Sequence, residues 1–309
     1  MRKLLILLAC ALALVSGCGQ AVAGREKTPE PPGTAASAAS APSHSSSFVS
    51  LAEFNYCLSR YETERTKAAP PGAENGAAGK IIAGIVPHHL TAGHLTARFM
   101  EKLAQENPAV IVLVGPNHYN SGAKIITGVY DWQTPAGLVE SDKESVAELA
   151  ASGRIAIDDA VLDNEHSIGA VAPFIKYYLP EARLVPLIFH HGVSLEEVDA
   201  VLQALESCLA GKDYVVLGSV DFSHYLTRRE AGEKDKITLQ AMRDFNYAAL
   251  FTMDSSYLDS PASLSMVFRY AEQRGVRDFT VLDNTNSGFI LQNEQMETTS
   301  YFTLLFSGN

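Results

Sequence analysis

The most informative stretch for the fold is residues 109–119, with the sequence Ala109-Val-Ile-Val-Leu-Val-Gly-Pro-Asn-His-Tyr119. An uninterrupted apolar run of this length, ended by Gly and Pro, predicts a strand that is buried on both faces. The turn that follows carries a histidine and a tyrosine. The stretch therefore predicts a strand in the middle of a covered sheet, with polar chemistry placed where that strand ends.

Similar apolar runs alternate with helical patterns along the rest of the chain. The expected strands are Ile81–Val86, Ala109–Val114, Leu184–Phe189, Tyr214–Leu217, Asp278–Leu282 and Tyr301–Phe306. The expected helices cover residues 91–105, a segment that starts at Ser194, and residues 235–252 and 261–274. This alternation indicates a mostly parallel sheet with helices on both faces. We expect one α/β domain over residues 79–309, with a mostly parallel central sheet flanked by helices.

Three of the expected strands end in turns that contain histidine. The turns are Val86-Pro-His-His89, Val114-Gly-Pro-Asn-His-Tyr119 and Gly218-Ser-Val-Asp-Phe-Ser-His-Tyr225. In open α/β sheets, ligands bind outside the carboxyl ends of the strands. Neutral imidazole is the commonest protein ligand for metals. One such histidine alone is more often a capping or hydrogen-bonded structural residue, but three at equivalent strand ends predict a shared pocket.

A fourth segment, Asp163-Asn-Glu-His-Ser167, crowds carboxylates and an imidazole together. It also fits the start of a helix, with Asp163 or Asn164 as the N-cap, and both interpretations can hold at once. Among the other histidines, we expect His89 to point away from His88 and His94 to be a structural residue of the following helix. His190 and His191 follow a strand and are candidates for the pocket rim.

The N-terminus has the features of an export signal. A basic start, Met1-Arg-Lys3, precedes an apolar run from Leu4 to Val15 that is too short to span a bilayer comfortably. The segment Leu14-Val-Ser-Gly-Cys18 then resembles a bacterial lipobox, so residues 1–17 are expected to be removed and Cys18 to carry lipid. The alternative is a plain secretory signal with an incidental Cys18.

The next segment, residues 18–78, is expected to be a tether between the lipid and the domain. Much of it is rich in Ala, Ser and Pro, a composition that buries too little apolar surface to fold. A short helix is expected within it at residues 48–66. The expected location is the outer face of the bacterial cytoplasmic membrane, or the periplasm as a lipoprotein.

Charge and cysteine content restrict the partners. Two of the 24 Lys and Arg precede Cys18, so 22 remain against 35 Asp and Glu, a net charge of −13. This acidic balance argues against nucleic acid, which is bound mainly through Lys and Arg on phosphates. Cys57 and Cys208 are the other cysteines of the mature chain, and they have the option of pairing in an oxidising compartment.

Four motifs in this order resemble the Memo family, whose members include the B component of the AmmeMemoRadiSam system. They are the Pro-His turn at 87–88, Gly-Pro-Asn-His at 115–118, Asp-x-Glu-His-Ser at 163–167 and Asp-Phe-Ser-His at 221–224. Thr134-Pro135 and Ser300-Tyr301 fit the same pattern, and the resemblance covers residues 80–307. It implies a fold similar to class III extradiol dioxygenases, which hold iron with two histidines and a carboxylate.

The resemblance also implies roles for individual residues. His88 and His118 become the metal-facing histidines, and His224 becomes a pocket acid or base. In some family members a cysteine supplies the third ligand, but the matching segment here is Tyr257-Leu-Asp-Ser-Pro261. Strict spacing places Tyr257 at the cysteine position, whereas Asp259 is the better donor. A carboxylate there favours iron, with copper or zinc as the alternatives.

Two functions therefore stay open. One is a non-haem metal-dependent oxidoreductase, with His88, His118 and Asp259 on the metal and with His224, His166 and Asp221 in catalytic roles. The other is a non-catalytic module that binds a small molecule or peptide in the same pocket, lined by Asn117, Tyr119, Glu165 and Tyr225. A direct partnership with a cytosolic radical-SAM enzyme conflicts with the export signal.

Overall fold

The computed structural model describes residues 41–45, 48–67 and 79–308. The expected signal peptide and Cys18 lie outside the described residues. Among the described residues, none of the helices contains an apolar stretch that could span a bilayer.

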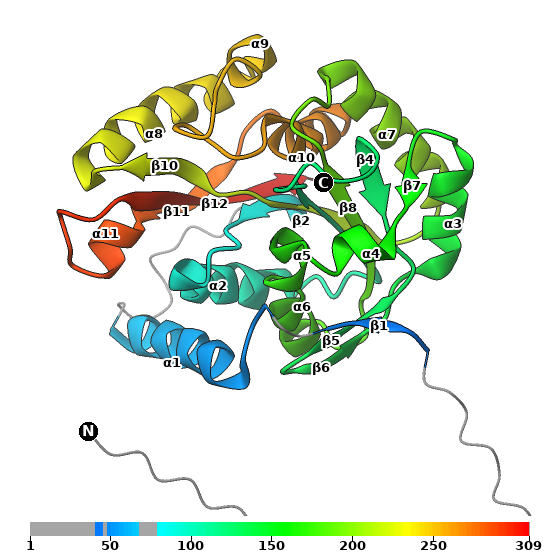
Figure 1. The fold of residues 1–309 in the computed structure, drawn as a ribbon, viewed down its shortest axis with the longest axis horizontal. Helices are drawn as coiled ribbons and strands as arrows, with labels where there is room; N and C mark the ends of the chain where they lie inside the picture. The colour runs from blue at the N-terminus through cyan, green and yellow to red at the C-terminus, as the bar shows by residue number, and fades with distance from the viewer. Residues whose placement is uncertain (1–40, 46–47, 68–78, 309) are drawn as a thin grey trace, which may run out of the picture. The chain divides into compact units, whose positions relative to one another are not determined.

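A mixed sheet forms the centre of the domain (Figure 1). In sheet order its strands are β10 (Phe222–Leu226), β12 (Thr298–Gly308), β2 (Lys80–Val86), β9 (Tyr214–Ser219), β3 (Val110–Pro116), β8 (Arg183–Phe189), β4 (Ile125–Thr127) and β7 (Ala156–Ile157), and β11 (Thr280–Asn286) pairs with β12. The single α/β domain is confirmed. The four middle strands β2, β9, β3 and β8 are parallel, but β10, β11 and β12 run antiparallel and β4 is antiparallel to β8. The sheet is thus parallel at its centre and antiparallel on its flanks.

Strand β3 shows why its apolar run is unbroken. Val110, Val112 and Val114 belong to one hydrophobic core, whereas Ile111 and Leu113 belong to a second core on the other face of the sheet. Successive side chains of a strand point to opposite faces, so a strand covered on both faces needs apolar residues at every position.

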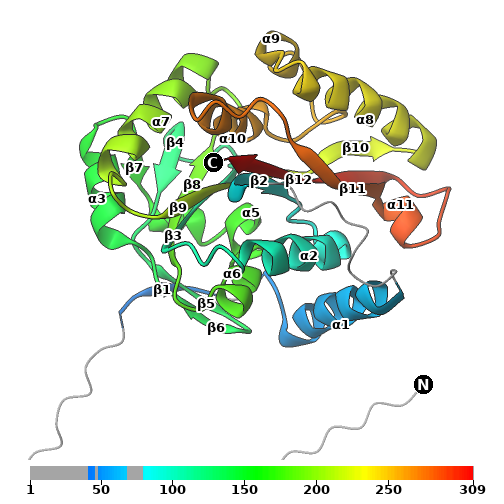
Figure 2. The ribbon, with the colours of Figure 1, turned by 180° about the vertical axis from the view of Figure 1, so that it is seen from behind.

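Helices cover both faces of this sheet (Figures 1 and 2). On the first face lie α3 (Lys143–Ala151), α7 (Leu195–Cys208), α8 (Arg228–Arg243), α9 (Tyr247–Leu250) and α10 (Pro261–Gln273). On the second lie α1 (Leu51–Lys67), the 3₁₀ turn η1 (Leu90–Ala92), α2 (Gly93–Leu103) and α6 (Ala172–Tyr178). The remaining short helices are α4 (Asp159–Leu162), α5 (His166–Gly169) and α11 (Ser287–Ile290).

Local capping sets where the longer helices begin. Ser194 and Glu197 form a capping box at the start of α7, as the sequence suggested, and Thr227 with Glu230 forms a second at α8. That second box begins α8 seven residues before the expected helix at 235–252, and α9 is a separate turn. Ser260 caps α10 and Pro261 occupies its first turn.

The described N-terminal residues, 41–45 and 48–67, pack on the domain, whereas the sequence analysis included them in a tether. Helix α1, expected at residues 48–66, lies against α2 and buries Phe54, Cys57 and Tyr61. Upstream, β1 (Ser43–His44) pairs with β5 (Asp131–Thr134), which pairs with β6 (Gly137–Val139). Scattered apolar residues and one histidine make these contacts, and the surrounding Ala, Ser and Pro residues obscure them in the sequence.

The two cysteines within the described residues are free thiols. Cys57 is buried in the second core, and Cys208 packs beside the first core from α7. Since the sheet separates these cores, the disulfide that the sequence left open is absent.

Candidate metal centre

Three neighbouring parallel strands position the site. Strands β2, β9 and β3 lie side by side in register, with Val86 opposite Ser219 and Val114 opposite Gly218. Their carboxyl ends therefore meet at one edge of the sheet, as ligand sites in open α/β folds require. Gly115 allows the segment that contains Ser167 to lie close to β3, because a Cβ at residue 115 would lie 2.5 Å from the hydroxyl of Ser167.

His88 follows β2 and is buried. Its Nδ1 lies 3.0 Å from Ser219 Oγ, and the Ser219 hydroxyl donates to the carbonyl of Ser167 at 2.6 Å. Since that hydroxyl has used its proton, it accepts from His88, and we assign the ring proton to Nδ1. The Nε2 lone pair of His88 is then free to bind a cation. Burial lowers the pKa of His88 well below its usual value, and His118 and His166 add to the effect.

His118 follows β3 and is held by Glu165. Its Nδ1 lies 2.7 Å from Glu165 Oε1, and its backbone N–H donates to Oε2 at 2.8 Å. The amide of Ser167 donates to Oε1 at 2.9 Å. Although burial acts to raise it, the pKa of Glu165 is lowered, because His118 and these amides donate to the carboxylate. An ionised Glu165 holds the proton on Nδ1, which leaves Nε2 as a lone pair, as in the carboxylate–histidine pairs of metal sites.

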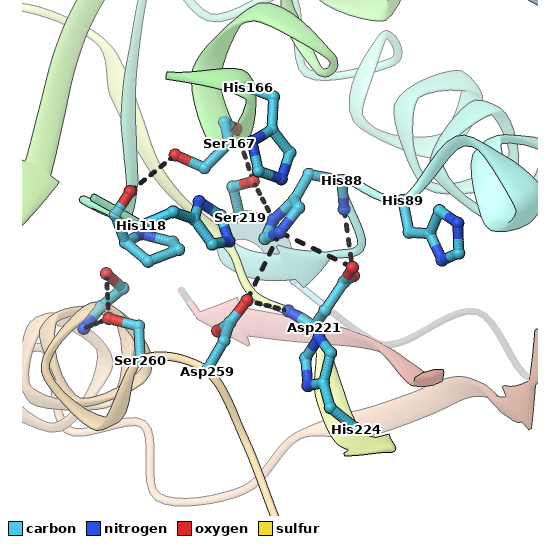
Figure 3. A network of polar contacts seen from close by, with 12 residues as sticks. His88, His89, His118, His166, Ser167, Ser219, Asp221, His224, Asp259 and Ser260 are labelled. Atoms are coloured by element: carbon cyan, nitrogen blue, oxygen red, sulfur yellow. Dashed lines mark hydrogen bonds and ion pairs between the residues drawn. The ribbon is translucent and has the colours of Figure 1, made fainter. Parts of the chain in front are cut away.

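His166 completes a group of three imidazoles. Its ring stacks on His118 with centroids 4.1 Å apart and meets His88 edge-on at 5.2 Å. One ring nitrogen from each of the three histidines lies within 4.8 Å of the other two. Donors bound to one ion at ~2.2 Å lie at most ~4.4 Å apart, so small side-chain rotations would bring all three onto one ion. Figure 3 shows the three rings facing a common space.

Two carboxyls close this space from below in Figure 3. Asp259 Oδ2 lies 3.4 Å from His88 Nε2, and Asp221 Oδ2 lies 3.6 Å from the same atom. The segment at 257–259 pairs with 221–223 through backbone hydrogen bonds, and this pairing places Asp259 beside His88. Ser260, the next residue, caps α10 and anchors the segment.

In the part of the chain that the structure describes, the buried carboxyls Asp259 and Asp221 lack a nearby positive charge that would stabilise their ionised form. Burial raises the pKa of Asp259 well above its usual value, with Asp221 adding to the rise, and burial also raises the pKa of Asp221. Asp259 Oδ1 is buried and has no hydrogen-bond partner among the described residues. Buried carboxylates are normally paired or bound to metals. The lone pairs of His88 and His118, with the Asp259 carboxyl beside His88, therefore fit a divalent metal ion.

A cavity of about 170 Å³ lies next to His118. His118, Asp259, His224, Tyr225, His191 and Asn117 are among its lining residues. Burial lowers the pKa of His224 to about 4, so this ring is neutral near pH 7. Its Nδ1 lies 3.3 Å from the carbonyl of Ser255. With a proton on Nδ1, its Nε2 would accept a proton from a ligand.

Only some of the residues expected to line the pocket do so in the structure. Tyr225 and Asn117 line the cavity, but Tyr119 is 69% exposed and is not among the lining residues. Glu165 lies behind His118 as its hydrogen-bond partner and is not part of the cavity wall. A buried carboxylate adjacent to a histidine motif is as compatible with orienting that histidine as with contacting a ligand.

His166 and Asp221 both lie beside His88, and their expected catalytic roles stay predictions. His166 stands with the two candidate metal ligands, and Asp221 accepts a hydrogen bond from the His88 backbone at 3.2 Å. Whether Asp259 or His166 supplies the third ligand stays a prediction. The sequence analysis did not assign a role to Ser219. The only sign of its importance in the sequence is that it is a polar residue at the end of an apolar strand.

The remaining histidines lie outside the group of three imidazoles. His89 points away from the three rings in Figure 3, and its Nδ1 lies 2.7 Å from the Tyr301 hydroxyl. His94 is buried under α1, with Nε2 3.6 Å from Glu64. His190 and His191 stack on each other at 4.4 Å, and His191 reaches the cavity as expected for a rim residue.

Comparison with known proteins agrees with this architecture. The family model described as Memo-like protein matches residues 59–304. A MEMO1 family protein of Pyrobaculum aerophilum is 30% identical over 240 residues, which cover 74% of this chain and 84% of the relative. The relative from Pyrobaculum arsenaticum is 31% identical over 241 residues, with the same coverage. A third, from Pyrococcus abyssi, is 36% identical over 168 residues, 49% of this chain and 56% of the relative. By its fold and by this match over most of its length, the chain belongs to the Memo family.

Proposed function

We propose that this chain is a metal-dependent oxidoreductase of the non-haem type, with His88, His118 and Asp259 as metal ligands and His166 beside them. The observation that carries the proposal is the orientation of two imidazoles. Ser219 and Glu165 hold the Nδ1 protons of His88 and His118, which leaves both Nε2 lone pairs unused, and Asp259 Oδ2 lies 3.4 Å from His88 Nε2. Two histidines and one carboxylate are the ligand set of non-haem iron oxygenases.

In this proposal each residue has a separate task. A bound iron ion would supply Lewis-acid and redox chemistry at the edge of the cavity. Glu165 fixes the orientation of His118, and Ser219 and Asp221 fix that of His88. His224, neutral near pH 7, accepts a proton from a ligand hydroxyl in the cavity. His191 and Tyr225 line the cavity and would contact the ligand there.

Elemental analysis tests the metal. The chain is purified without chelators or nickel resin, alongside His88→Ala and His118→Ala. We expect close to one equivalent of iron in the parent protein and strong loss in both variants. Copper or zinc at one equivalent would keep the metal centre but change its identity. Full metal content in both variants would refute the ligand assignment.

Oxygen uptake then tests the reaction. Small catechols and peptides are offered to the iron-loaded protein under air, and His224→Gln serves as a variant with an intact metal set. Uptake that depends on both iron and His224 supports the oxidoreductase. An absence of uptake with every compound, together with a full metal site, would favour the second function below.

The second candidate is a non-catalytic binding module. It is favoured by Tyr225, which lines the cavity, is 72% exposed and has a φ of 58°. A non-glycine residue in this conformation costs energy and often marks a ligand contact. Ligand binding that persists after metal removal, and that is lost in Tyr225→Ala, would support this function.

We also propose that the chain is an exported lipoprotein. Support comes from the basic start, the short apolar run and Cys18 in its lipobox-like context. Metabolic labelling with a fatty-acid probe should mark the chain, and Cys18→Ser should remove the label. A labelled Cys18→Ser variant would contradict the assignment.

A further inference from the structure

A short segment before the family-matched region packs against the part of the chain that carries Glu165 and His166. We name it the N-terminal clasp and define it as Ser43, His44, Phe48 and Val49. The family model begins its match at residue 59, so the clasp lies before that match. Through His44 and Phe48 it contacts the segment 158–169, which contains α4, Glu165 and α5.

The first contact is made by His44, which is fully buried. Its Nδ1 forms a hydrogen bond with Asp163 Oδ1 at 2.6 Å, whereas its Nε2 lies 3.2 Å from Asp159 Oδ1 without hydrogen-bond geometry. The ring also packs on Trp132, with centroids 4.2 Å apart, and β1 pairs His44 with Trp132 in register. One imidazole therefore joins the β5 strand to two carboxylates at either end of α4.

The second contact is made by Phe48. Its ring covers Gly169, because a Cβ at that glycine would lie 2.3 Å from Phe48 Cδ2. The same ring lies 6.4 Å from the ring of His166. The clasp thus contacts the segment on both sides of His166, at Asp163 and at Gly169.

His166 is the member of the three imidazoles that most needs such support. His88 and His118 each have a ring nitrogen within 3.0 Å of an oxygen of a buried partner, Ser219 or Glu165. His166, among the described residues, has no contact of this kind: its nearest charged neighbour is Glu165 Oε1 at 3.7 Å. Its ring position therefore depends on the backbone of the segment and on stacking with His118.

We propose that the N-terminal clasp positions His166 at the metal centre, with His44 as the positioning residue. Ser167 is anchored separately, through Pro116 and Ser219, so the clasp acts mainly on the outer part of the segment. The stretch between the export signal and the family domain then contributes to the site and does more than connect it to the membrane. The effect on metal affinity rests on the proposed function, whereas the effect on the segment does not.

Hydrogen exchange tests the clasp without any metal. His44→Ala is compared with the parent in the full chain, and Lys80→Ala, which breaks the distant Lys80–Asp213 ion pair, is the control. We expect at least threefold faster exchange in peptides from 158–169 for His44→Ala and no change in peptides from 298–306. The control should leave both regions unchanged. Unchanged exchange at 158–169 in His44→Ala would overturn the proposal.

Binding of Co²⁺ tests the consequence for the centre. Titration followed by the visible absorption of the ion should give a three- to tenfold weaker affinity and an altered spectrum in His44→Ala. Because a glutamine can still donate to Asp163, His44→Gln should recover part of both. A lower melting temperature with unchanged Co²⁺ affinity and spectrum would reduce His44 to a structural residue and overturn the proposal.

Two further controls keep the outcomes separable. If His44→Ala does not fold, Asp163→Ala removes the same interaction from the other side and must show the same local rise in exchange. If the parent chain binds no Co²⁺, the proposed function fails, and the exchange measurement alone decides the clasp.

Discussion

The substitution Glu165→Gln tests how the protein prepares His118 for a cation. The Glu165 side chain accepts from His118 Nδ1 at 2.7 Å, from the His118 backbone at 2.8 Å and from the Ser167 backbone at 2.9 Å. An amide has a single acceptor oxygen, so its NH₂ group must face one of these donors. If the NH₂ faces the backbone of His118, a buried N–H loses its acceptor at a cost of about 1–3 kcal/mol.

If the NH₂ instead faces the ring of His118, it donates to Nδ1 and moves the proton to Nε2. The lone pair that would bind the metal is then lost. In both orientations we expect metal affinity to fall about 10- to 100-fold, the range for partners of metal-bound histidines. Competition titration with a chromophoric chelator measures the change.

The matched control is Glu106→Gln. Glu106 also accepts from a backbone amide, that of Ile81 at 3.1 Å, and is remote from the strand ends that form the centre. It should leave metal affinity unchanged. Metal affinity within twofold of the parent in Glu165→Gln would show that the Glu165–His118 pair does not prepare the ligand.

Three other predictions concern stability, packing and proton transfer. Burial lowers the pKa of His94 from 6.5 to about 4, so the unfolded chain binds more protons between these pH values and the free energy of unfolding falls as the pH drops through them. Between pH 7 and pH 5, His94 should lower the free energy of unfolding by about 2 kcal/mol. In urea titrations at the two pH values, His94→Gln should lose correspondingly less stability than the parent. An equal loss of stability in parent and variant would exclude His94 as its source. Gly115→Ala should destabilise the protein by about 1–3 kcal/mol and lower metal affinity, because the new methyl group meets Ser167, whereas Gly232→Ala, in an open position of α8, should stabilise it by about 0.5–1 kcal/mol; similar effects of both substitutions on the melting temperature would contradict this packing. His224→Gln should leave metal content intact and reduce any turnover by roughly 10²–10⁴-fold, and equal loss of metal and turnover would instead make His224 a ligand.

The central strands and their histidine turns were predictable because the signals are local. An apolar run such as residues 109–114 must be covered on both faces, and the topology of open α/β sheets then brings the ends of β2, β9 and β3 together. The resemblance of the motifs to the Memo family gave the same answer and was confirmed. Short strands such as β4 and β7 have too few residues for a periodic pattern and were missed.

The composition of the metal centre was only partly predictable, since it depends on tertiary contacts. His166 joins His88 and His118 because Gly115 allows the α5 segment to approach β3, a contact that no local pattern reports. Asp259 reaches His88 through backbone pairing of its segment with residues 221–223. His44 was overlooked for another reason: it lies in a stretch whose average composition indicates a tether, although its own side chain is fully buried.

The central claim is that imidazoles from separate loops hold one metal ion above the parallel strand ends. Anomalous diffraction from crystals of the metal-loaded protein tests this most directly. We predict a single strong peak bounded by residues 88, 118 and 259 or 166, with His88 and His118 Nε2 both ~2.0–2.2 Å from it. A peak elsewhere, or one in this space with either of those two nitrogens turned away, would contradict the account.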